Sequence, residues 1–143
     1  MSQSVFPFIA YEDAGAAMDW LVLAFGFRET RRIKNDDGLV VHGELEISGN
    51  TVMVASPTLD YQGPRRHAEN CEEARRWTDV PWVIDGVMVY VKDLDAHYLQ
   101  AEAAGATILS AIEKGGDGDR QYRASDSEGH RWMFAERSGG HGN

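Results

Sequence analysis

The sequence is poor in the residues that cross-links and membrane spans require. One of the 143 residues is cysteine, Cys71, so the chain can form no internal disulfide and no cysteine-based metal cluster. The longest apolar run, at 16–25, is interrupted by Asp19 and is too short to cross a bilayer. The N-terminus lacks the basic start and apolar stretch of a secretory signal peptide. These absences predict a cytoplasmic protein with no membrane partner.

Basic residues are also scarce. The chain has 14 Lys and Arg against 23 Asp and Glu, which gives a formal net charge of -9. The sequence contains no basic stripe that could release counterions from a phosphate backbone, so a nucleic-acid partner is not expected. An anionic membrane surface is excluded on the same ground. The acidic balance favours a neutral or cationic small ligand, or serves solubility alone.

An internal repeat is present. The stretches SGNTVMVAS and SEGHRWMFAE each place Met four residues and Ala six residues after a Gly. One constant offset superposes these stretches and also the Asp residues that begin two apolar helical patterns. The matched pairs are Asp13 and Asp93, Gly49 and Gly129, Met53 and Met133, and Ala55 and Ala135.

Both halves predict the same order of elements. In the first half Asp13 caps a helix that Gly26 ends, and in the second half Asp93 and Gly105 have these roles. The first half predicts strands at 5–11, 27–34, 39–47 and 51–55 and a helix at 14–25. The second half predicts strands at 87–91, 106–112, 120–125 and 130–136 and a helix at 94–104. The fold class is therefore α+β, with two tandem βαβββ modules that form a curved mixed sheet with helices outside and a cleft within.

A chain of this length suits a single domain. We divide it into a first module at 1–56, an insert at 57–85, a second module at 86–137 and a tail at 138–143. The insert is rich in aromatic and arginine side chains, including Trp77 and Trp82, and predicts a short helix at 67–77. Its tryptophans are candidates for ligand stacking. They could instead hold the insert to its own domain or fill a dimer interface.

Alternation along 39–47 places His42 and Glu44 on one face of a strand, with Glu46 next on that face. Val41, Leu45 and Ile47 then face the helix, which leaves His42 and Glu44 toward the cleft. The repeat offset matches Tyr122 to His42, so Tyr122 joins the cleft candidates. A solvated polar face is the alternative. We expect His97 to be exposed on its helix and His130 to have a structural role.

Three stretches carry a resemblance to a known family: DAGAAMDWLVLAFGF at 13–27, DLDAHYLQAEAAGATI at 93–108 and RQYRASDSEGHRWMFAE at 120–136. They resemble the vicinal oxygen chelate superfamily, which includes glyoxalase I, bleomycin resistance proteins and extradiol dioxygenases. Ser127 stands where the family's final turn has Pro. The resemblance implies the tandem βαβββ fold over nearly the whole chain, but the fold hosts unrelated chemistries.

Metal-dependent members of this family bind a divalent ion through His or Glu on the first and last strands of each module. The resemblance places these positions at Phe6, Met53, Gly86 and Met133. None of these side chains is a ligand for a hard or borderline ion. We therefore expect no metal and no cofactor, with Phe6, Met53 and Met133 as cleft walls.

The resemblance then implies a metal-free small-molecule-binding protein of the bleomycin-resistance type. Such a protein would sequester a hydrophobic or cationic compound, such as an antibiotic, and would act as a homodimer. One alternative is a lyase, epimerase or dioxygenase with an atypical site around His42 and Glu44. Another is a non-catalytic dimeric interaction subunit.

Overall fold

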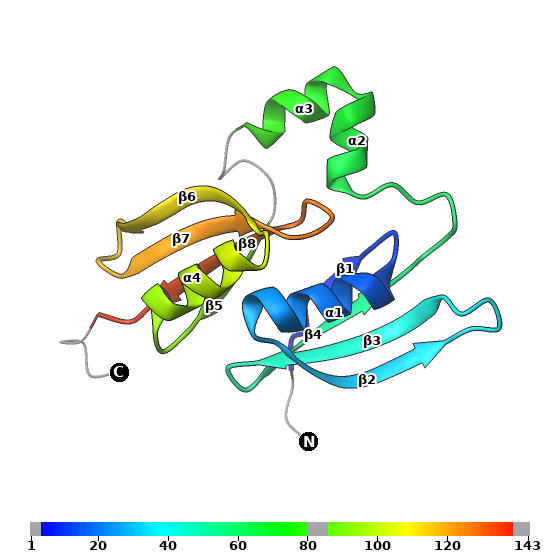
Figure 1. The fold of residues 1–143 in the computed structure, drawn as a ribbon, viewed down its shortest axis with the longest axis horizontal. Coiled ribbons are helices and arrows are strands. Elements are labelled where there is room, and N and C mark those ends of the chain that lie inside the picture. The colour runs from blue at the N-terminus through cyan, green and yellow to red at the C-terminus, as the bar shows by residue number, and fades with distance from the viewer. Residues whose placement is uncertain (1–3, 80–85, 139–143) are drawn as a thin grey trace.

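A computed structural model describes residues 4–79 and 86–138 and confirms the tandem arrangement (Figure 1). The first module comprises β1 (Phe8–Ala10), α1 (Ala14–Phe25), β2 (Arg28–Lys34), β3 (Val40–Ile47) and β4 (Asn50–Ala55). The second module comprises β5 (Gly86–Tyr90), α4 (Leu94–Ala103), β6 (Thr107–Lys114), β7 (Arg120–Ser125) and β8 (Arg131–Glu136). Between them lie α2 (Pro64–Asn70) and α3 (Glu72–Thr78).

The two long helices begin at the predicted caps. The Asp13 carboxylate accepts a hydrogen bond from the Ala16 amide at 3.0 Å, and Asp93 accepts one from Ala96 at 3.1 Å. Gly26 ends α1 in the left-handed conformation, at φ 80°, which glycine adopts without strain. The insert differs from the prediction, because its single expected helix is broken at Cys71, whose backbone is extended.

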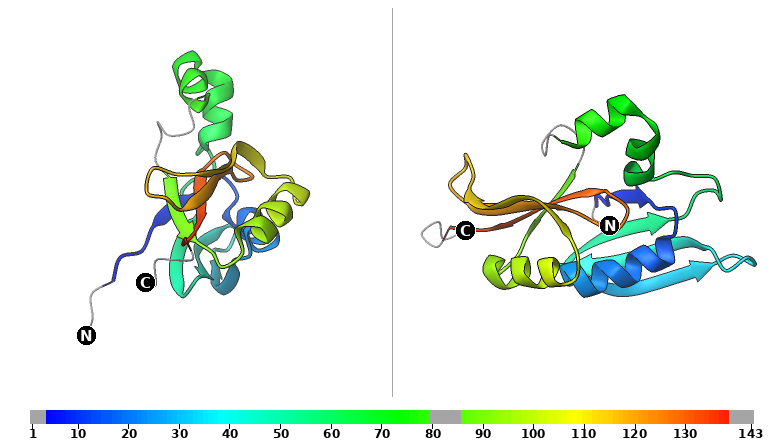
Figure 2. Two further views of the ribbon diagram at one scale, coloured as in Figure 1. Left: turned by 90° about the vertical axis from the view of Figure 1, so that its left-hand side faces the viewer. Right: turned by 45° about the horizontal axis from the view of Figure 1, so that its top comes forward.

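Each module forms its own four-stranded sheet. The strand order is β1-β4-β3-β2 in sheet A and β5-β8-β7-β6 in sheet B. The first and last strands of each module pair in parallel, and the remaining pairs are antiparallel. Helices α1 and α4 lie on one side of the sheets and α2 and α3 on the other (Figure 2). We call the side of each sheet that faces away from its long helix the open face.

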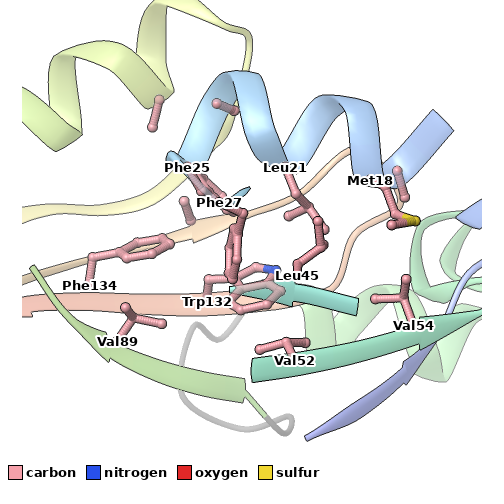
Figure 3. Close-up of a cluster of buried hydrophobic side chains, with 14 of the residues drawn as sticks. Met18, Leu21, Phe25, Phe27, Leu45, Val52, Val54, Val89, Trp132 and Phe134 are labelled. Carbon is pink, nitrogen blue, oxygen red and sulfur yellow. The ribbon is translucent and has the colours of Figure 1, made fainter. Parts of the chain in front are cut away.

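The helix-facing sides of both sheets contribute to one hydrophobic core (Figure 3). Phe25, at the end of α1, packs on two aromatic rings of β8, with ring centroids 5.9 Å from Trp132 and 4.7 Å from Phe134. All three side chains are fully buried. Such aromatic contacts add about 0.5–1.5 kcal/mol per pair beyond the burial of apolar area. Neither module therefore completes its core alone.

A buried carboxylate also connects the modules. Asp126, in the turn between β7 and β8, is 1% exposed. Its carboxylate accepts hydrogen bonds from the Tyr11 hydroxyl at 2.5 Å and from the Trp132 indole N–H at 3.0 Å. The other carboxylate oxygen accepts the amides of Glu128 and His130, both at 3.0 Å. Burial, and then the nearby Asp126 charge, raise the pKa of Tyr11 well above its ordinary value.

His97 is not exposed as expected but lies where α4 meets α1. The Phe25 carbonyl lies 2.8 Å from Nε2, and the Tyr122 hydroxyl lies 2.7 Å from Nδ1. Because a carbonyl can only accept, Nε2 carries the proton and Nδ1 accepts from Tyr122. The helix pattern did not reveal this contact, because α1 of the other module covers this part of α4. His130 has the expected structural contact, between Nε2 and the Ala10 carbonyl at 2.7 Å.

Among the helices of the described residues, none combines the length and apolar character needed to cross a membrane.

Replacing Tyr11 by Phe should lower the free energy of unfolding by about 1–3 kcal/mol, because the buried Asp126 carboxylate loses a donor. Urea denaturation monitored by circular dichroism measures the change. Tyr61→Phe is the matched control, since the Tyr61 hydroxyl makes only a 3.5 Å contact with a backbone carbonyl. An equal effect of the two substitutions would contradict the importance of Asp126.

Stability should fall as the pH drops below about 6.5, the ordinary pKa of histidine. Burial lowers the pKa of His97, opposed by its hydrogen bond to Phe25, so the unfolded chain takes up the proton before the folded chain does. Stability is therefore full above the unfolded pKa and is lost as the pH falls toward the folded pKa. Melting temperatures at pH 8 and pH 5.5 should differ more for the wild type than for His97→Gln, and parallel losses would contradict this assignment.

Candidate functional site

Strand register places two rows of side chains across the open faces. On each sheet the row contains one residue from each of the four strands, paired directly across neighbouring strands. The sheet A row is Phe8, Met53, Glu44 and Arg31. The sheet B row is Met88, Met133, Arg123 and Ser110. The two rows occupy equivalent positions in the two modules.

The first-strand members of these rows are not the residues that the resemblance indicated. Phe8, not Phe6, lies opposite Met53, and Met88, not Gly86, lies opposite Met133. Phe6 precedes β1. The repeat offset is the same for both pairs, but a sequence does not show the register between two parallel strands far apart in the chain. The shift of two residues keeps the same face of the strand.

The centres of the two rows do not fit the divalent ion that metal-dependent relatives would hold. Phe8 offers a phenyl ring, and Met53, Met88 and Met133 offer thioethers, which suit soft ions such as Cu(I). Across residues 4–79 and 86–138, no group of three or more His, Cys, Asp or Glu side chains is placed to hold a metal. The expected lack of a metal site remains a prediction, supported by the chemistry of these side chains.

His42 and Glu44 come together on the open face of sheet A. His42 Nε2 lies 2.7 Å from Glu44 Oε2, and Arg31 lies 3.8 Å from the same carboxylate oxygen. Glu46 does not join them, because it pairs with Arg28 at 2.6 Å. Glu44 therefore has two cationic or polar partners within the chain.

Tyr122 does not lie in the cleft. It is fully buried on the helix-facing side of sheet B, opposite Phe134 and bonded to His97. The β7–β8 hairpin is one residue longer than the β3–β4 hairpin, and a shift of one residue moves a side chain to the other face of a strand. Burial raises the pKa of Tyr122, which keeps its hydroxyl protonated as a donor to His97.

Arg123 is the open-face residue that the sequence reasoning missed. It pairs with Met133 on β8 just as Glu44 pairs with Met53 on β4. Its Nε and the hydroxyl of its cross-strand neighbour Ser110 are both buried, and neither has a hydrogen-bond partner among the described residues. The longer second hairpin was the signal: with one extra residue allowed for, Glu44 matches Arg123, and His42 matches Gln121 rather than Tyr122.

A cavity of about 350 Å³ lies between the insert and the open face of sheet B. Its lining includes Arg65 and Ala68 of α2, Asp79 after α3, Leu109 of β6, Ser125 of β7 and Arg131 of β8. Ser125 is the next residue after Arg123 on the same face of β7. Arg131 is 8% exposed and donates to the Trp77 carbonyl at 3.3 Å. The insert thus covers one end of the sheet B open face.

Two further cavities follow the seam between β1 and β5. One, of about 340 Å³, is lined by residues that include Phe8, Gly86 and Arg131. The other, of about 530 Å³, includes Met88 and Tyr90. Phe8 and Met88, the first-strand members of the two rows, therefore each line a cavity at the surface.

The two tryptophans that were candidates for ligand stacking contribute less directly to the open face than the row residues do. The Trp77 side chain is half-exposed on α3, and its backbone carbonyl rather than its ring contacts Arg131. Trp82 lies outside the described residues.

Two tandem βαβββ modules, with their helices on one side and cavities on the other, define the class of fold. The sequence matches the family described as the Glyoxalase/Bleomycin resistance protein/Dioxygenase superfamily over residues 5–134. The chain therefore belongs to this superfamily, the vicinal oxygen chelate superfamily.

Individual relatives agree with this assignment. The chain is 30% identical over 130 residues to an uncharacterized protein of Mycobacterium tuberculosis strain H37Rv, covering 91% of this chain and 72% of that protein. It is similar to the crystal structure of TioX from Micromonospora sp. ML1, with 32% identity, a TM-score of 0.68, and coverage of 95% of this chain and 97% of TioX. A glyoxalase-related enzyme from Clostridium phytofermentans, at 15% identity, 95% coverage of both chains and a TM-score of 0.66, shows the same fold.

Proposed function

We propose that this protein binds a hydrophobic small molecule on the open faces of its sheets without using a divalent metal, and sequesters it. The observation that carries the proposal is the set of side chains at the centres of the two rows, Phe8, Met53, Met88 and Met133. The resemblance places the metal-ligand positions of the superfamily at Phe6, Met53, Gly86 and Met133, so neither set offers the His or Glu that a divalent metal needs. Antibiotics with flat aromatic parts are our candidate ligands, because the family includes bleomycin resistance proteins.

The chemistry of these side chains suits an apolar ligand. Methionine is flexible and polarizable, and a contact between its sulfur and an aromatic ring contributes about 0.3–1.5 kcal/mol. The cavities of about 350 and 530 Å³ beside the rows fall within the range typical of small-molecule pockets. Met88 and Phe8 are also partly exposed, so a bound ligand would remove apolar surface from water.

Local charge argues against a cationic ligand, although the net charge of the chain favours one. Glu44 already has His42 and Arg31 as partners. On sheet B the open face carries the arginines Arg123 and Arg131 and one carboxylate, that of Glu113, which lies opposite Gln121. We therefore favour a ligand that is neutral or acidic where it contacts sheet B.

Catalysis is the second candidate, and the His42–Glu44 contact of 2.7 Å favours it. A carboxylate that orients an imidazole is a common arrangement for a general base. Such an enzyme would abstract or transfer a proton of a ligand bound on sheet A.

Purified protein should contain no stoichiometric Ni, Fe, Mn or Zn and should show saturable tryptophan-fluorescence quenching by at least one flat aromatic antibiotic from a panel. Met133→Gln should weaken that binding about ten-fold, since it places an amide in apolar contacts. Leu99→Gln is the control, because Leu99 is 63% exposed on α4, away from the open face.

A stoichiometric bound metal, or no quenching by any compound, would contradict sequestration. Chromatography of the same mixtures separates binding from catalysis. A compound consumed by the wild type but not by His42→Gln would establish the enzyme instead.

We also propose that the protein is a homodimer. The segment before and within β1 exposes adjacent apolar side chains, with Val5 94%, Phe6 47% and Phe8 61% exposed. Contiguous apolar surface of this kind is typical of interaction sites. Light scattering coupled to size-exclusion chromatography should give twice the chain mass of 15.9 kDa, reduced by Val5→Asp. A wild-type monomer at micromolar concentration would contradict the dimer.

A further inference from the structure

We infer that Arg123 anchors an acidic group of the ligand, and that the ligands of the sheet B row are flat aromatic carboxylates. This inference rests on the proposed function, because it names the ligand chemistry of the same open face. It comes from the contrast between two equivalent positions, Glu44 in the first module and Arg123 in the second.

In the sheet A row the charges are satisfied within the chain. The Glu44 carboxylate lies 2.7 Å from His42 and 3.8 Å from Arg31. In the sheet B row the neighbours of Arg123 across the strands are Met133 and Ser110, which carry no charge. Within residues 4–79 and 86–138 Arg123 makes no ion pair and its Nε no hydrogen bond.

A guanidinium that lacks an ion pair can bind a hydrogen-bond acceptor on a ligand. Arginine cannot lose its proton in a protein, so Arg123 remains charged. A buried donor without a partner destabilises the protein relative to one that is bonded. Nε is enclosed by the protein, whereas the two terminal nitrogens are not among the buried unbonded atoms, so they are the donors that can reach the two oxygens of a ligand carboxylate through two hydrogen bonds. The Ser110 hydroxyl beside it is likewise enclosed and has no hydrogen-bond partner among the described residues.

The order of the row defines the shape of the ligand. Met88 and Met133 form its apolar half, and Arg123 and Ser110 form its polar half. Adjacent strands are about 4.8 Å apart, so the row spans about 14 Å from Met88 to Ser110. A bicyclic aromatic acid fits this span, with its rings against the methionine sulfurs and its carboxylate at Arg123.

The neighbouring charges agree with an acidic ligand. Arg65 and Arg131 line the cavity beneath α2, one step along the open face from Arg123. The carboxylate that lines the same cavity, Asp79, lies 3.9 Å from Arg75. The end of the open face next to α2 is therefore cationic, in a protein with a net charge of -9, whereas the carboxylate of Glu113, opposite Gln121, lies on the other side of Arg123.

Isothermal titration calorimetry with three isosteric probes tests the inference: 2-naphthoate, 2-naphthylmethanol and 2-naphthylmethylammonium. We expect 2-naphthoate to bind most tightly. Arg123→Met, which keeps the length of the side chain and removes its charge, should weaken 2-naphthoate binding about 10- to 100-fold, as expected for a charge-assisted hydrogen bond. It should leave 2-naphthylmethanol within about three-fold. Arg28→Met is the control, since it changes the net charge equally at an exposed position on sheet A.

The outcomes separate this inference from the proposed function. If the probes bind with no preference for the acid, or if Arg123→Met binds 2-naphthoate as the wild type does, the inference is wrong and the proposed function stands. If none of the three probes binds at millimolar concentration, both fail. A loss of 2-naphthoate binding confined to Arg123→Met supports both.

Thermal stability supplies an independent readout. Because Arg123 has no ion pair, and its Nε no hydrogen bond, among the described residues, Arg123→Met should melt no lower than the wild type without ligand. 2-Naphthoate should raise the melting temperature of the wild type but not that of Arg123→Met. A melting temperature lowered by more than about 2 °C would show that Arg123 supports the fold, and would overturn its assignment as a ligand anchor.

Discussion

The buried carboxylate of Asp126 is the interaction on which the arrangement of the two modules depends. It receives donors from Tyr11 just after β1, from β8 and from its own turn, so the last hairpin is held against the first module. The same contacts hold Trp132 beside Phe25 in the shared core. Along β8 successive side chains alternate between faces, so the placement of Trp132 in the core also places Arg131 and Met133 on the open face. The site thus follows from the core.

The turn around Asp126 also positions the insert. The Glu128 carboxylate accepts the amides of Glu12 and Asp13 at the start of α1, while its backbone carbonyl accepts the Arg65 amide at the start of α2. Gly129 is needed at this junction for two reasons. Its φ of 95° is left-handed, and a Cβ there would lie 2.8 Å from the Arg65 nitrogen. One turn therefore fixes α1 of the first module and the helix that covers the open face of the second.

Signals between residues close together in the sequence predicted the fold. The site depends instead on contacts between residues far apart in the chain. The caps at Asp13 and Asp93 and the repeated Gly-to-Met spacing depend on nearby residues, so they could be recognised in the sequence and gave both modules. The pairing of Phe8 with Met53 depends on strands far apart in the chain, so the sequence alone indicated Phe6 and not Phe8. Tyr122 was misplaced because a constant offset ignores one extra residue in a hairpin. The burial of His97 was missed because the helix that covers it, α1, belongs to the other module.

The duplicated fold constrains its two faces differently, and this explains where function can reside. Helix-facing positions of both modules must remain apolar or well bonded, because they build one core from Phe25, Trp132 and their neighbours. Open-face positions carry no such requirement, so equivalent residues can differ in charge. Glu44 is paired with His42 and Arg31, whereas among the described residues Arg123 has no ion-pair partner. Arg123 lies outside the buried core and has no ion-pair partner among the described residues, and an acidic ligand bound on this face would supply that partner.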